Sequence, residues 1–239
     1  ELQKDIENKE RIDQMRQEFL NNVSHELKTP IALVQGYAEG LKENISDDPE
    51  SREFYCDVIM DEASKMNKLV KNLLTLNHLE SGSDEVTMER FDIVTLIKGV
   101  LQSMDIMIQQ KEAKVSFAAE DTVYVWADEF KIEEVVTNYT SNALNHLAGD
   151  KEIEIRVLPD GDRVKVTVFN TGQPIPEADL PKLWNKFYKV DKARTREYGG
   201  SGIGLSIVKA IMEGLHQEYG VQNYDNGVEF WFTLDRKND

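Results

Sequence analysis

The N-terminal third of the chain carries apolar residues at a helical spacing, interrupted by one short polar turn. Within residues 1–45 these residues mostly stand three or four positions apart, which predicts one long helix. Residues 46–49, Ser-Asp-Asp-Pro, predict a turn, and the proline can open a second helix that runs to about Leu79. Two long helices joined by a short turn form an antiparallel hairpin. The apolar positions of the first helix are Leu2, Ile6, Ile12, Met15, Phe19, Val23, Leu27, Ile31, Val34, Ala38, Leu41 and Ile45.

Each predicted helix has an apolar stripe that is wider than one partner helix can cover. In the second helix, Ile59, Met66 and Leu73 stand seven residues apart, with further apolar residues beside them. We therefore expect a homodimer through residues 1–80, in which two hairpins form a four-helix bundle. The alternative is that the stripe packs on the rest of the same chain.

A change of pattern follows Ser81-Gly82-Ser83-Asp84, a composition typical of a linker. Strands and helices then occur together, and strands in runs with helices to one side predict an α+β two-layer sandwich. The last two strands flank Asp225-Asn226-Gly227, a hairpin turn. We expect helices at about 93–110, 128–147, 178–188 and 203–216, and strands at about 114–118, 122–127, 151–158, 163–169, 219–224 and 227–234.

Composition and charge exclude several classes of protein. With 28 Lys and Arg against 44 Asp and Glu, the net charge is −16, which repels nucleic acid. No apolar run approaches the roughly 18 residues of a membrane span, so we expect no membrane contact. The single cysteine, Cys56, excludes a disulfide framework and a Cys-based zinc site, and we expect it to be a passive core residue. The start at Glu1 without a signal peptide suggests a fragment of a longer protein.

His25 is the first candidate reactive residue. It stands two positions after Val23, on the opposite side of the helix from the apolar face, so its side chain should point to solvent. An exposed imidazole is largely neutral at pH 7 and keeps a lone pair on one ring nitrogen. Glu26 is adjacent and could orient the ring, and Thr29 lies one turn away. The simpler alternative is an ordinary surface histidine.

A stripe of polar residues marks the helix at 128–147. Glu134, Asn138, Asn142 and Asn145 follow one another at spacings of four, four and three on an otherwise apolar helix. Asparagine is unfavourable inside helices, and its carbonyl oxygen suits Mg²⁺ that also bridges phosphates. A solvated helix face is the alternative.

Two glycine-containing loops complete the pattern. Asn170 ends a strand and is followed by Thr171 and Gly172, which allows backbone to approach a flat ligand. By itself this stretch is a weak signal, and a plain turn is the simpler interpretation. Gly200, Gly202 and Gly204 lead directly into the helix at 203–216, whose N-terminus can bind phosphate, and simple helix capping is the alternative. The loop from 172 is about thirty residues long, as lids often are. Within residues 182–196 of this loop the basic residues outnumber the single acid Asp191, and they are Lys182, Lys186, Lys189, Lys192, Arg194 and Arg196.

Together these stretches resemble the H, N, G1, F and G2 boxes of sensor histidine kinases of two-component systems, in the same order and over nearly the whole chain. The resemblance implies a dimerisation and phosphotransfer hairpin, followed by an ATP-binding domain of the Bergerat type found in gyrase and heat-shock chaperones. It also implies four segments: 1–18, the end of a signalling helix; 19–81, the phosphotransfer domain; 82–90, a linker; and 91–239, the catalytic domain. A cytoplasmic fragment of a membrane-anchored parent is expected.

The resemblance assigns roles to residues. His25 would be the phosphoacceptor, Glu26 its acid/base partner, and Thr29 part of a His-Glu-x-x-Thr motif of kinases that also dephosphorylate their response regulator. ATP and Mg²⁺ would be the cofactors, with Asn142 the metal ligand, and a response-regulator receiver domain would be the partner. The nucleotide-binding residues would be Asn138, Asn142, Asn145, Asn170, Gly172, Tyr188, Lys189, Gly200, Gly202, Gly204 and Leu205, with Trp184 and Phe187 completing the F box.

Three positions depart from the family pattern. Asn170 stands where Asp is usual, Pro174 replaces a glycine, and Asn145 with His146 replaces Lys and an aromatic residue. They are the evidence for a rival hypothesis, a degenerate nucleotide domain that only scaffolds a partner through the hairpin. His25, Asn142 and the glycine-rich loop argue against it and favour an ATP-dependent protein-histidine kinase. Incubation with labelled ATP separates the two.

Overall fold

The computed structural model describes residues 2–43, 48–82, 85–119, 121–190 and 200–236. The chain divides into two compact units, Glu1–Leu74 and Thr75–Asp239. In the described part of the chain no helix is both long and apolar enough to traverse a bilayer.

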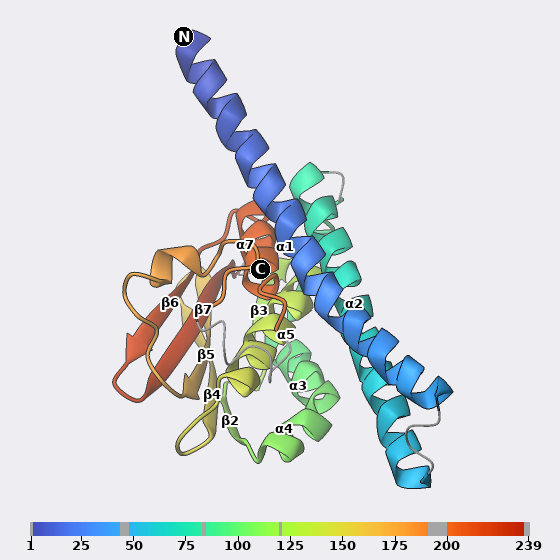
Figure 1. Cartoon of the computed structure of the whole chain (residues 1–239). Coiled ribbons are helices and arrows are strands. Elements are labelled where there is room, and N and C mark those ends of the chain that lie inside the picture. The colour runs from blue at the N-terminus through green and yellow to red at the C-terminus, as the bar shows by residue number, and fades with distance from the viewer. Residues whose placement is uncertain (1, 44–47, 83–84, 120, 191–199, 237–239) are drawn as a thin grey trace. The chain divides into compact units, whose positions relative to one another are not determined.

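The first unit is the predicted helical hairpin (Figure 1). Helix α1 spans Leu2–Lys42 and helix α2 spans Pro49–Ser81. Of the predicted turn, positions 46 and 47 lie outside the described residues. Asp48 begins α2, because its Oδ1 accepts a 2.8 Å hydrogen bond from the Ser51 amide, and Pro49 fits the first helical position, where no amide hydrogen is needed.

Close contact between the two helices is visible near the turn. Gly40 of α1 lies so near Tyr55 of α2 that an added Cβ would come within 2.7 Å of the ring. Tyr37 packs edge to face on Tyr55, with ring centroids 5.0 Å apart, and Phe54 joins this cluster. The glycine therefore permits an aromatic contact that ties the helices together.

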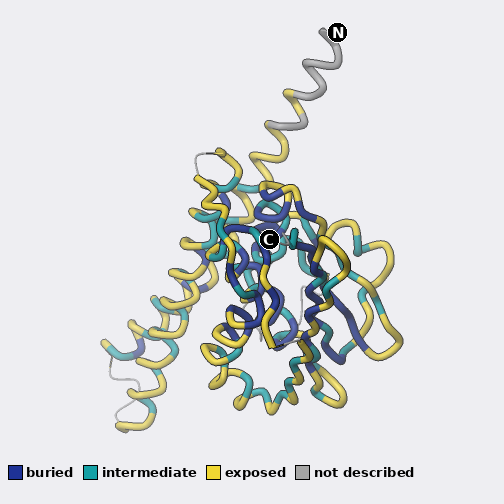
Figure 2. The backbone as a smooth tube through the Cα atoms, turned by 180° about the vertical axis from the view of Figure 1, so that it is seen from behind, coloured by how far each residue is buried: buried dark blue, intermediate teal, exposed yellow. Residues whose placement is uncertain are grey.

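Much of the apolar stripe of the hairpin is exposed in the single chain, as the yellow and teal tube in Figure 2 shows. Within this stripe Met15 is 52% exposed and Val70 is 46% exposed. The expected dimer stays a prediction that this exposure motivates. The expectation for Cys56 is wrong: Cys56 is exposed on α2, because α1 does not cover that position.

The second unit is the predicted two-layer sandwich. Its seven-stranded sheet has the order β1-β3-β7-β5-β4-β2, with β6 paired to β7. Only β2 and β4 run parallel among the paired strands described, so the sheet is mixed. The strands are β1 (Glu89–Asp92), β2 (Lys114–Ala118), β3 (Tyr124–Ala127), β4 (Glu152–Asp160), β5 (Arg163–Thr171), β6 (Tyr219–Tyr224) and β7 (Gly227–Asp235).

Helices cover one face of this sheet (Figure 1). The alternating buried residues of β4, β5 and β7 meet across the register, as in the pairs Ile155 with Val168 and Val168 with Phe230. Tyr139 is fully buried and packs on Phe230 with ring centroids 5.3 Å apart. The helices are α3 (Ile93–Ser103), α4 (Asp105–Lys111), α5 (Glu129–Asn145) and α7 (Gly204–Gly214).

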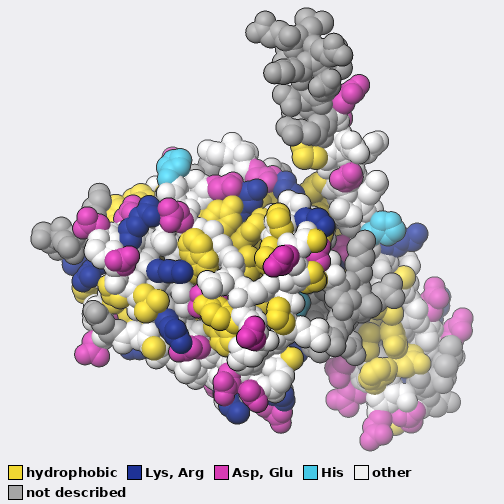
Figure 3. All heavy atoms as spheres, turned by 90° about the vertical axis from the view of Figure 1, so that its left-hand side faces the viewer, with side chains coloured by type: hydrophobic (Ala, Val, Ile, Leu, Met, Phe, Trp, Pro, Cys, Tyr) yellow, Lys and Arg dark blue, Asp and Glu magenta, His cyan; other side chains and the backbone are white. Residues whose placement is uncertain are grey.

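The opposite face of the sheet carries aromatic and charged side chains side by side. Figure 3, seen from the side of β6 and β7, shows hydrophobic and charged side chains mixed on the surface. Lys165 stands 4.7 Å from the ring centroid of Trp231, and Gly220 gives that ring room, since a Cβ there would come within 2.6 Å of it. Phe169 and Tyr224 meet edge to face at 5.6 Å. This face is thus covered by its own side chains.

Two predicted elements differ from the structure, and one further strand was not predicted. The helix expected at 93–110 is two helices, because Met104 leaves the helical conformation and the Ser103 hydroxyl donates to the Val100 carbonyl. The helix expected at 178–188 is wrong: only the 3₁₀ turn η1 (Leu180–Lys182) forms there. Phe187 has a φ of 61°, which a helix cannot continue. Strand β1 was not predicted.

Candidate functional site

His25, Glu26 and Thr29 lie on α1 in the first unit. The predicted exposure of His25 is confirmed, and Thr29, one turn further along the same side, is exposed as well. Glu26 is half-buried and Pro30 is buried. An imidazole in this position can meet a reactant from solvent, with a hydroxyl one turn away.

The remaining candidates lie in the second unit, and α5 is their centre. Asp128 fixes the start of α5, because its carboxylate accepts hydrogen bonds from the amides of Lys131 at 3.1 Å and Thr87 at 3.0 Å. One side of the helix is held in the core by Tyr139 and Ala143. The asparagines on its other side are therefore positioned by a rigid element.

The asparagine row is half-buried and unequally bonded. Asn138 donates from Nδ2 to the Glu134 carbonyl at 2.9 Å. The side chains of Asn142 and Asn145 make no hydrogen bond within the described ranges of the chain. Their amides are thus not needed to hold the fold, and they are available to a ligand.

The N-terminus of α7 meets this row. An added Cβ on Gly204 would lie 2.6 Å from Asn138 Oδ1, so the helix start and the asparagine are in direct contact. The first amide groups of a helix have no carbonyl partner inside the helix and favour anions. The pairing of Asn138 with Gly204 therefore brings amide oxygens and free amide hydrogens to one place.

The end of β5 forms a third part of the site. Asn170 is buried, and its Nδ2 donates to the Thr171 carbonyl at 3.2 Å. The Thr171 hydroxyl donates to the Ala148 carbonyl at 2.8 Å, and an added Cβ on Gly172 would lie 2.7 Å from the His146 carbonyl oxygen. Because His146 and Ala148 follow α5 directly, the end of β5 is fixed beside the C-terminus of the asparagine helix.

Phe187 of the F box and the glycine-rich segment from Gly200 to Gly204 come together at the base of the long loop. The Phe187 amide donates to the Gly202 carbonyl at 2.8 Å, and Gly202 has a φ of 71°, a conformation that favours glycine. Gly200 and Leu205 are half-buried beside it, as is Lys189. Residues 191–199 lie outside the described residues, and so do Lys192, Arg194 and Arg196 of the basic window.

Asp179 modifies the expected basic character of this loop. The Tyr188 hydroxyl donates to Asp179 Oδ1 at 2.6 Å, and this bond, followed by the nearby Lys182 ammonium, lowers the pKa of the Asp179 carboxyl. The same bond raises the pKa of the Tyr188 hydroxyl. Lys182 is 3.3 Å from Asp179 Oδ1, so part of the positive charge is already neutralised.

Asn223 of β6 was not predicted as a site residue, although its side chain holds the backbone of Ile175 through two hydrogen bonds. The available signal was the asparagine itself, because asparagine is unfavourable inside strands. Asp179 was not predicted either, because its distance in sequence from Tyr188 hides their contact.

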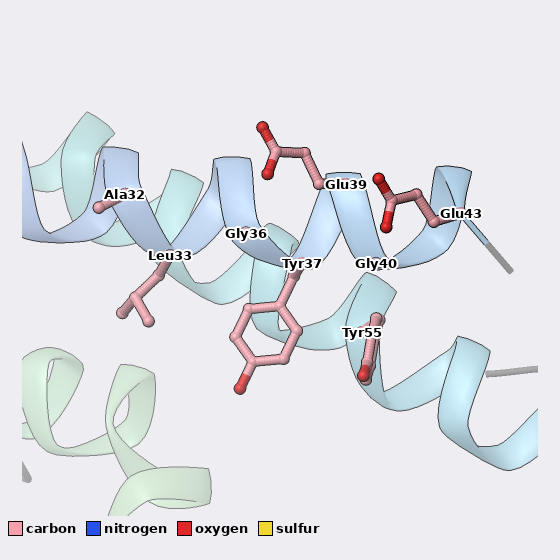
Figure 4. Close-up of a pocket in the computed structure, with 8 residues that line it drawn as sticks. All are labelled: Ala32, Leu33, Gly36, Tyr37, Glu39, Gly40, Glu43 and Tyr55. Atoms are coloured by element: carbon pink, nitrogen blue, oxygen red, sulfur yellow. The ribbon is translucent and has the colours of Figure 1, made fainter. Parts of the chain in front are cut away.

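Two of the hollows among the described residues lie on the hairpin of the first unit. The larger, of about 350 Å³, lies on the side of α1 that follows His25 and Thr29 along the helix. Figure 4 shows the carboxylates of Glu39 and Glu43 on one side of α1 and Leu33 and Tyr37 on the other. A second hollow has about 310 Å³ and includes Ile31, Val34 and Met66. The lining of the first is completed by Ala32, Gly36, Gly40 and Tyr55.

Comparison with protein families assigns each unit separately. Residues 15–82 match the His Kinase A (phospho-acceptor) domain. Residues 127–238 match the ATPase family of histidine kinases, DNA gyrase B and HSP90. His25 and the asparagine helix therefore fall inside the two matched regions.

Similar proteins span the whole chain. The sensor protein kinase WalK of Staphylococcus epidermidis is 32% identical over 233 residues, which are 96% of this chain and 38% of that protein. WalK of Staphylococcus aureus is also 32% identical, and the match covers 56% of its length. The chain thus spans well under two thirds of these relatives.

Solved structures resemble the chain across both units. The histidine kinase ThkA in its complex with the response regulator TrrA has a TM-score of 0.75 and 28% identity, with 96% of this chain and 64% of that chain covered. The histidine kinase AdeS of Acinetobacter baumannii has a TM-score of 0.74 at 22% identity, over 90% of this chain and 98% of that one, and supports the fold.

Proposed function

Because the chain belongs to the sensor histidine kinases, we propose that it transfers the γ-phosphoryl group of ATP to His25 and then to an aspartate of a response-regulator receiver domain. The observation that carries this proposal is the contact between Asn138 and Gly204, which joins an amide row to a helix N-terminus. His25 is exposed on a separate unit, as an acceptor must be.

ATP binds between α5, the end of β5 and the N-terminus of α7. Asn170 accepts from the adenine amino group through its Oδ1, and Gly172 lets the backbone approach the ring. The phosphates lie toward the row of Asn138, Asn142 and Asn145. Lys189, Tyr188 and the backbone of Gly200, Gly202, Gly204 and Leu205 enclose them from the loop and from α7.

The residues of the site fit a magnesium ion. The Asn142 amide has no hydrogen bond to the described part of the protein, and a neutral amide oxygen is a suitable ligand for a magnesium ion that is shared with phosphates. Among the described residues no three His, Cys, Asp or Glu side chains cluster in a way that could hold a metal. Asn142 is therefore the ligand that the protein supplies. When bound, Mg²⁺ neutralises part of the phosphate charge.

The chemistry needs little beyond positioning. The free ring nitrogen of His25 attacks the γ-phosphorus, a P–N bond forms, and the P–O bond to ADP breaks. The imidazolium that results loses its ring proton to the Glu26 carboxylate. An aspartate carboxylate of the receiver domain then attacks the phosphorus of the phosphohistidine. An O–P bond forms, the P–N bond breaks, and the proton held by Glu26 returns to the ring, so that an acyl phosphate and neutral imidazole result.

The receiver domain docks on the side of α1 that carries His25, Thr29 and the larger hollow. The solved complex of ThkA with a response regulator supports a partner of this class.

The exposed apolar residues of the hairpin pair with a second copy in a four-helix bundle. Residues 19–81 are the dimerisation and phosphotransfer domain. They follow the end of a signalling helix (1–18) and precede a linker (82–90) and the catalytic domain (91–239). Thr29 adds phosphatase activity toward the regulator.

The decisive experiment is incubation of the chain with labelled ATP and Mg²⁺. Phosphohistidine is labile in acid and stable in alkali, so the lability of the product identifies the acceptor. We expect wild-type protein to be labelled and His25→Gln to be unlabelled while it binds ATP with unchanged affinity. Label on His25→Gln would point to His78, His146 or His216, and ATP binding without any label would favour the scaffold alternative.

A further inference from the structure

Asn223 on β6 makes a two-point contact with the loop that follows β5. The Ile175 amide donates to Asn223 Oδ1 at 2.9 Å, and Asn223 Nδ2 donates to the Ile175 carbonyl at 2.7 Å. One side-chain amide thus satisfies both backbone groups of one residue, as a neighbouring strand would. The backbone of Asn223 meanwhile pairs with Val228 of β7, so this contact fastens the loop to the β6–β7 hairpin.

The same hairpin also holds the beginning of the loop. The Gly172 amide donates to the Asn226 carbonyl at 2.9 Å. On its other side Gly172 lies against the His146 carbonyl oxygen, where an added Cβ would come within 2.7 Å. The segment from Gly172 to Ile175 is therefore fastened at both ends, and Pro174 between them has no amide hydrogen to offer.

We infer that Asn223 is a positioning residue for the adenine end of the nucleotide site. This inference rests on the proposed function, in which Asn170 and Gly172 meet the adenine. Asn223 does not touch the nucleotide itself; it acts through Ile175 by keeping the four-residue segment 172–175 in one conformation before ATP arrives. A segment that is already ordered spares the ligand the entropy of ordering it, which strengthens binding.

The chemistry of the contact explains why asparagine is needed. Alanine removes both hydrogen bonds. Aspartate keeps the side-chain shape and the bond from the Ile175 amide, but it places a carboxylate oxygen against the Ile175 carbonyl where Nδ2 now donates. Both changes should release the loop, and both leave His25, Glu26 and the asparagine row untouched.

The test compares Asn223→Ala, Asn223→Asp and the control Gln222→Ala, whose exposed side chain on the same strand is not part of the contact. Calorimetry gives the Kd for ATP, labelled ATP gives KM and kcat for phosphorylation, and hydrogen exchange reports the Ile175 amide. We expect Kd and KM to rise about tenfold in both Asn223 variants with kcat within about twofold. We also expect faster exchange at Ile175 and unchanged exchange in β7.

The outcomes separate this inference from the proposed function. Wild-type protein that fails to bind ATP would overturn the proposed function. If wild-type protein binds ATP and both Asn223 variants bind it with the same Kd, the role of Asn223 is overturned. The same holds if the variants have a reduced kcat and an unchanged KM. If Asn223→Ala lowers the thermal midpoint strongly, Asn223→Asp, which keeps the shape of the side chain, decides between positioning and general folding.

Discussion

Gly204 and Asn138 lie in direct contact, so that a Cβ on Gly204 would come within 2.6 Å of Asn138 Oδ1. The asparagine cannot simply turn away, because its Nδ2 also donates to the Glu134 carbonyl at 2.9 Å. The identity of residue 204 and the orientation of residue 138 are thus coupled across two helices. This coupling ties the glycine-rich loop to the asparagine helix.

The first prediction is that Gly204→Ala weakens ATP binding about tenfold, or about 1.4 kcal/mol. The added methyl group must displace the Asn138 side chain or shift the start of α7, and overpacking of this kind costs about 1–3 kcal/mol. Calorimetry with Mg-ATP and urea unfolding measure the two effects. Gly214→Ala is the matched control, since it ends the same helix with no neighbouring atom within 4 Å of an added Cβ. Equal ATP affinity in both variants would contradict the coupling.

The second prediction concerns the magnesium ligand. Asn142→Ala should remove the Mg²⁺-dependent part of ATP binding while the thermal midpoint stays within about 2 °C, because the side chain has no hydrogen bond to the described protein. Calorimetry with and without Mg²⁺ measures the difference. Thr137→Ala, an exposed position on the same helix, should leave both quantities unchanged. Unaltered Mg-ATP affinity in Asn142→Ala would exclude Asn142 as the ligand.

The fold follows from sequence wherever the deciding interactions are local. The hairpin and α5 are set by apolar spacing, and the β6–β7 hairpin is set by the Asp225-Asn226 turn, so these were predicted. Strand β1 was not, because its pairing of Arg90 with Trp126 joins distant segments and its four residues show no pattern. Cys56 was misjudged because burial on a hairpin depends on a partner layer, which spacing alone does not show.

The site follows the same division. His25, the asparagine row and the glycines stand in short motifs, which a sequence displays directly. The contacts that hold them, Asn138 with Gly204, Gly172 with His146 and Tyr188 with Asp179, join separate elements. The individual residues could be proposed from the sequence. Only the structure shows which side chain contacts and orients which backbone segment.

The third prediction concerns the hollow on α1. Gly36 lines it, and a Cβ there would have no neighbouring atom within 4 Å, so Gly36→Leu can fill the hollow without strain in the chain. Removing a glycine from a helix interior should stabilise the hairpin by about 0.5–1 kcal/mol. We expect the phosphorylation of His25 to be unchanged. The rate of phosphoryl transfer to the regulator should fall at least about tenfold, because the leucine occupies the hollow in which the receiver domain docks. Single-turnover transfer from purified phosphoprotein measures this.

Two variants serve as controls, one for the size of the new side chain and one for the position of the substitution. Gly36→Ala should slow transfer less than Gly36→Leu, since it fills less of the hollow. Gly99→Leu makes the same change on α3, also with no atom within 4 Å of an added Cβ, and should leave transfer unaffected. Transfer at the wild-type rate from Gly36→Leu would remove the hollow from the docking surface.

The fourth prediction assigns the reverse reaction to Thr29. This residue is exposed one helical turn from His25, on the side of α1 where the regulator docks in our proposal. A hydroxyl can both donate and accept, so it can orient a water for in-line attack on an aspartyl phosphate without acting as a nucleophile. No strong base is needed, because an acyl phosphate is already activated. Thr29→Ala should therefore keep phosphorylation of His25 and slow the loss of phosphate from the regulator about tenfold or more.

The measurement is the decay of purified phospho-regulator in the presence of wild-type or Thr29→Ala protein, with ADP or a non-hydrolysable ATP analogue. Thr29→Ser, which keeps the hydroxyl, should retain most of the phosphatase rate. The alternative is structural: Thr29 precedes Pro30, which is buried inside α1 and leaves one backbone carbonyl without its usual helical donor. If Thr29 has a structural role, Thr29→Ala and Thr29→Ser should both change the thermal midpoint, and both should leave the decay rate of the phospho-regulator equal to that with wild type. If Thr29 positions a water, the decay should be slow with Thr29→Ala and close to wild type with Thr29→Ser, because only the serine keeps the hydroxyl.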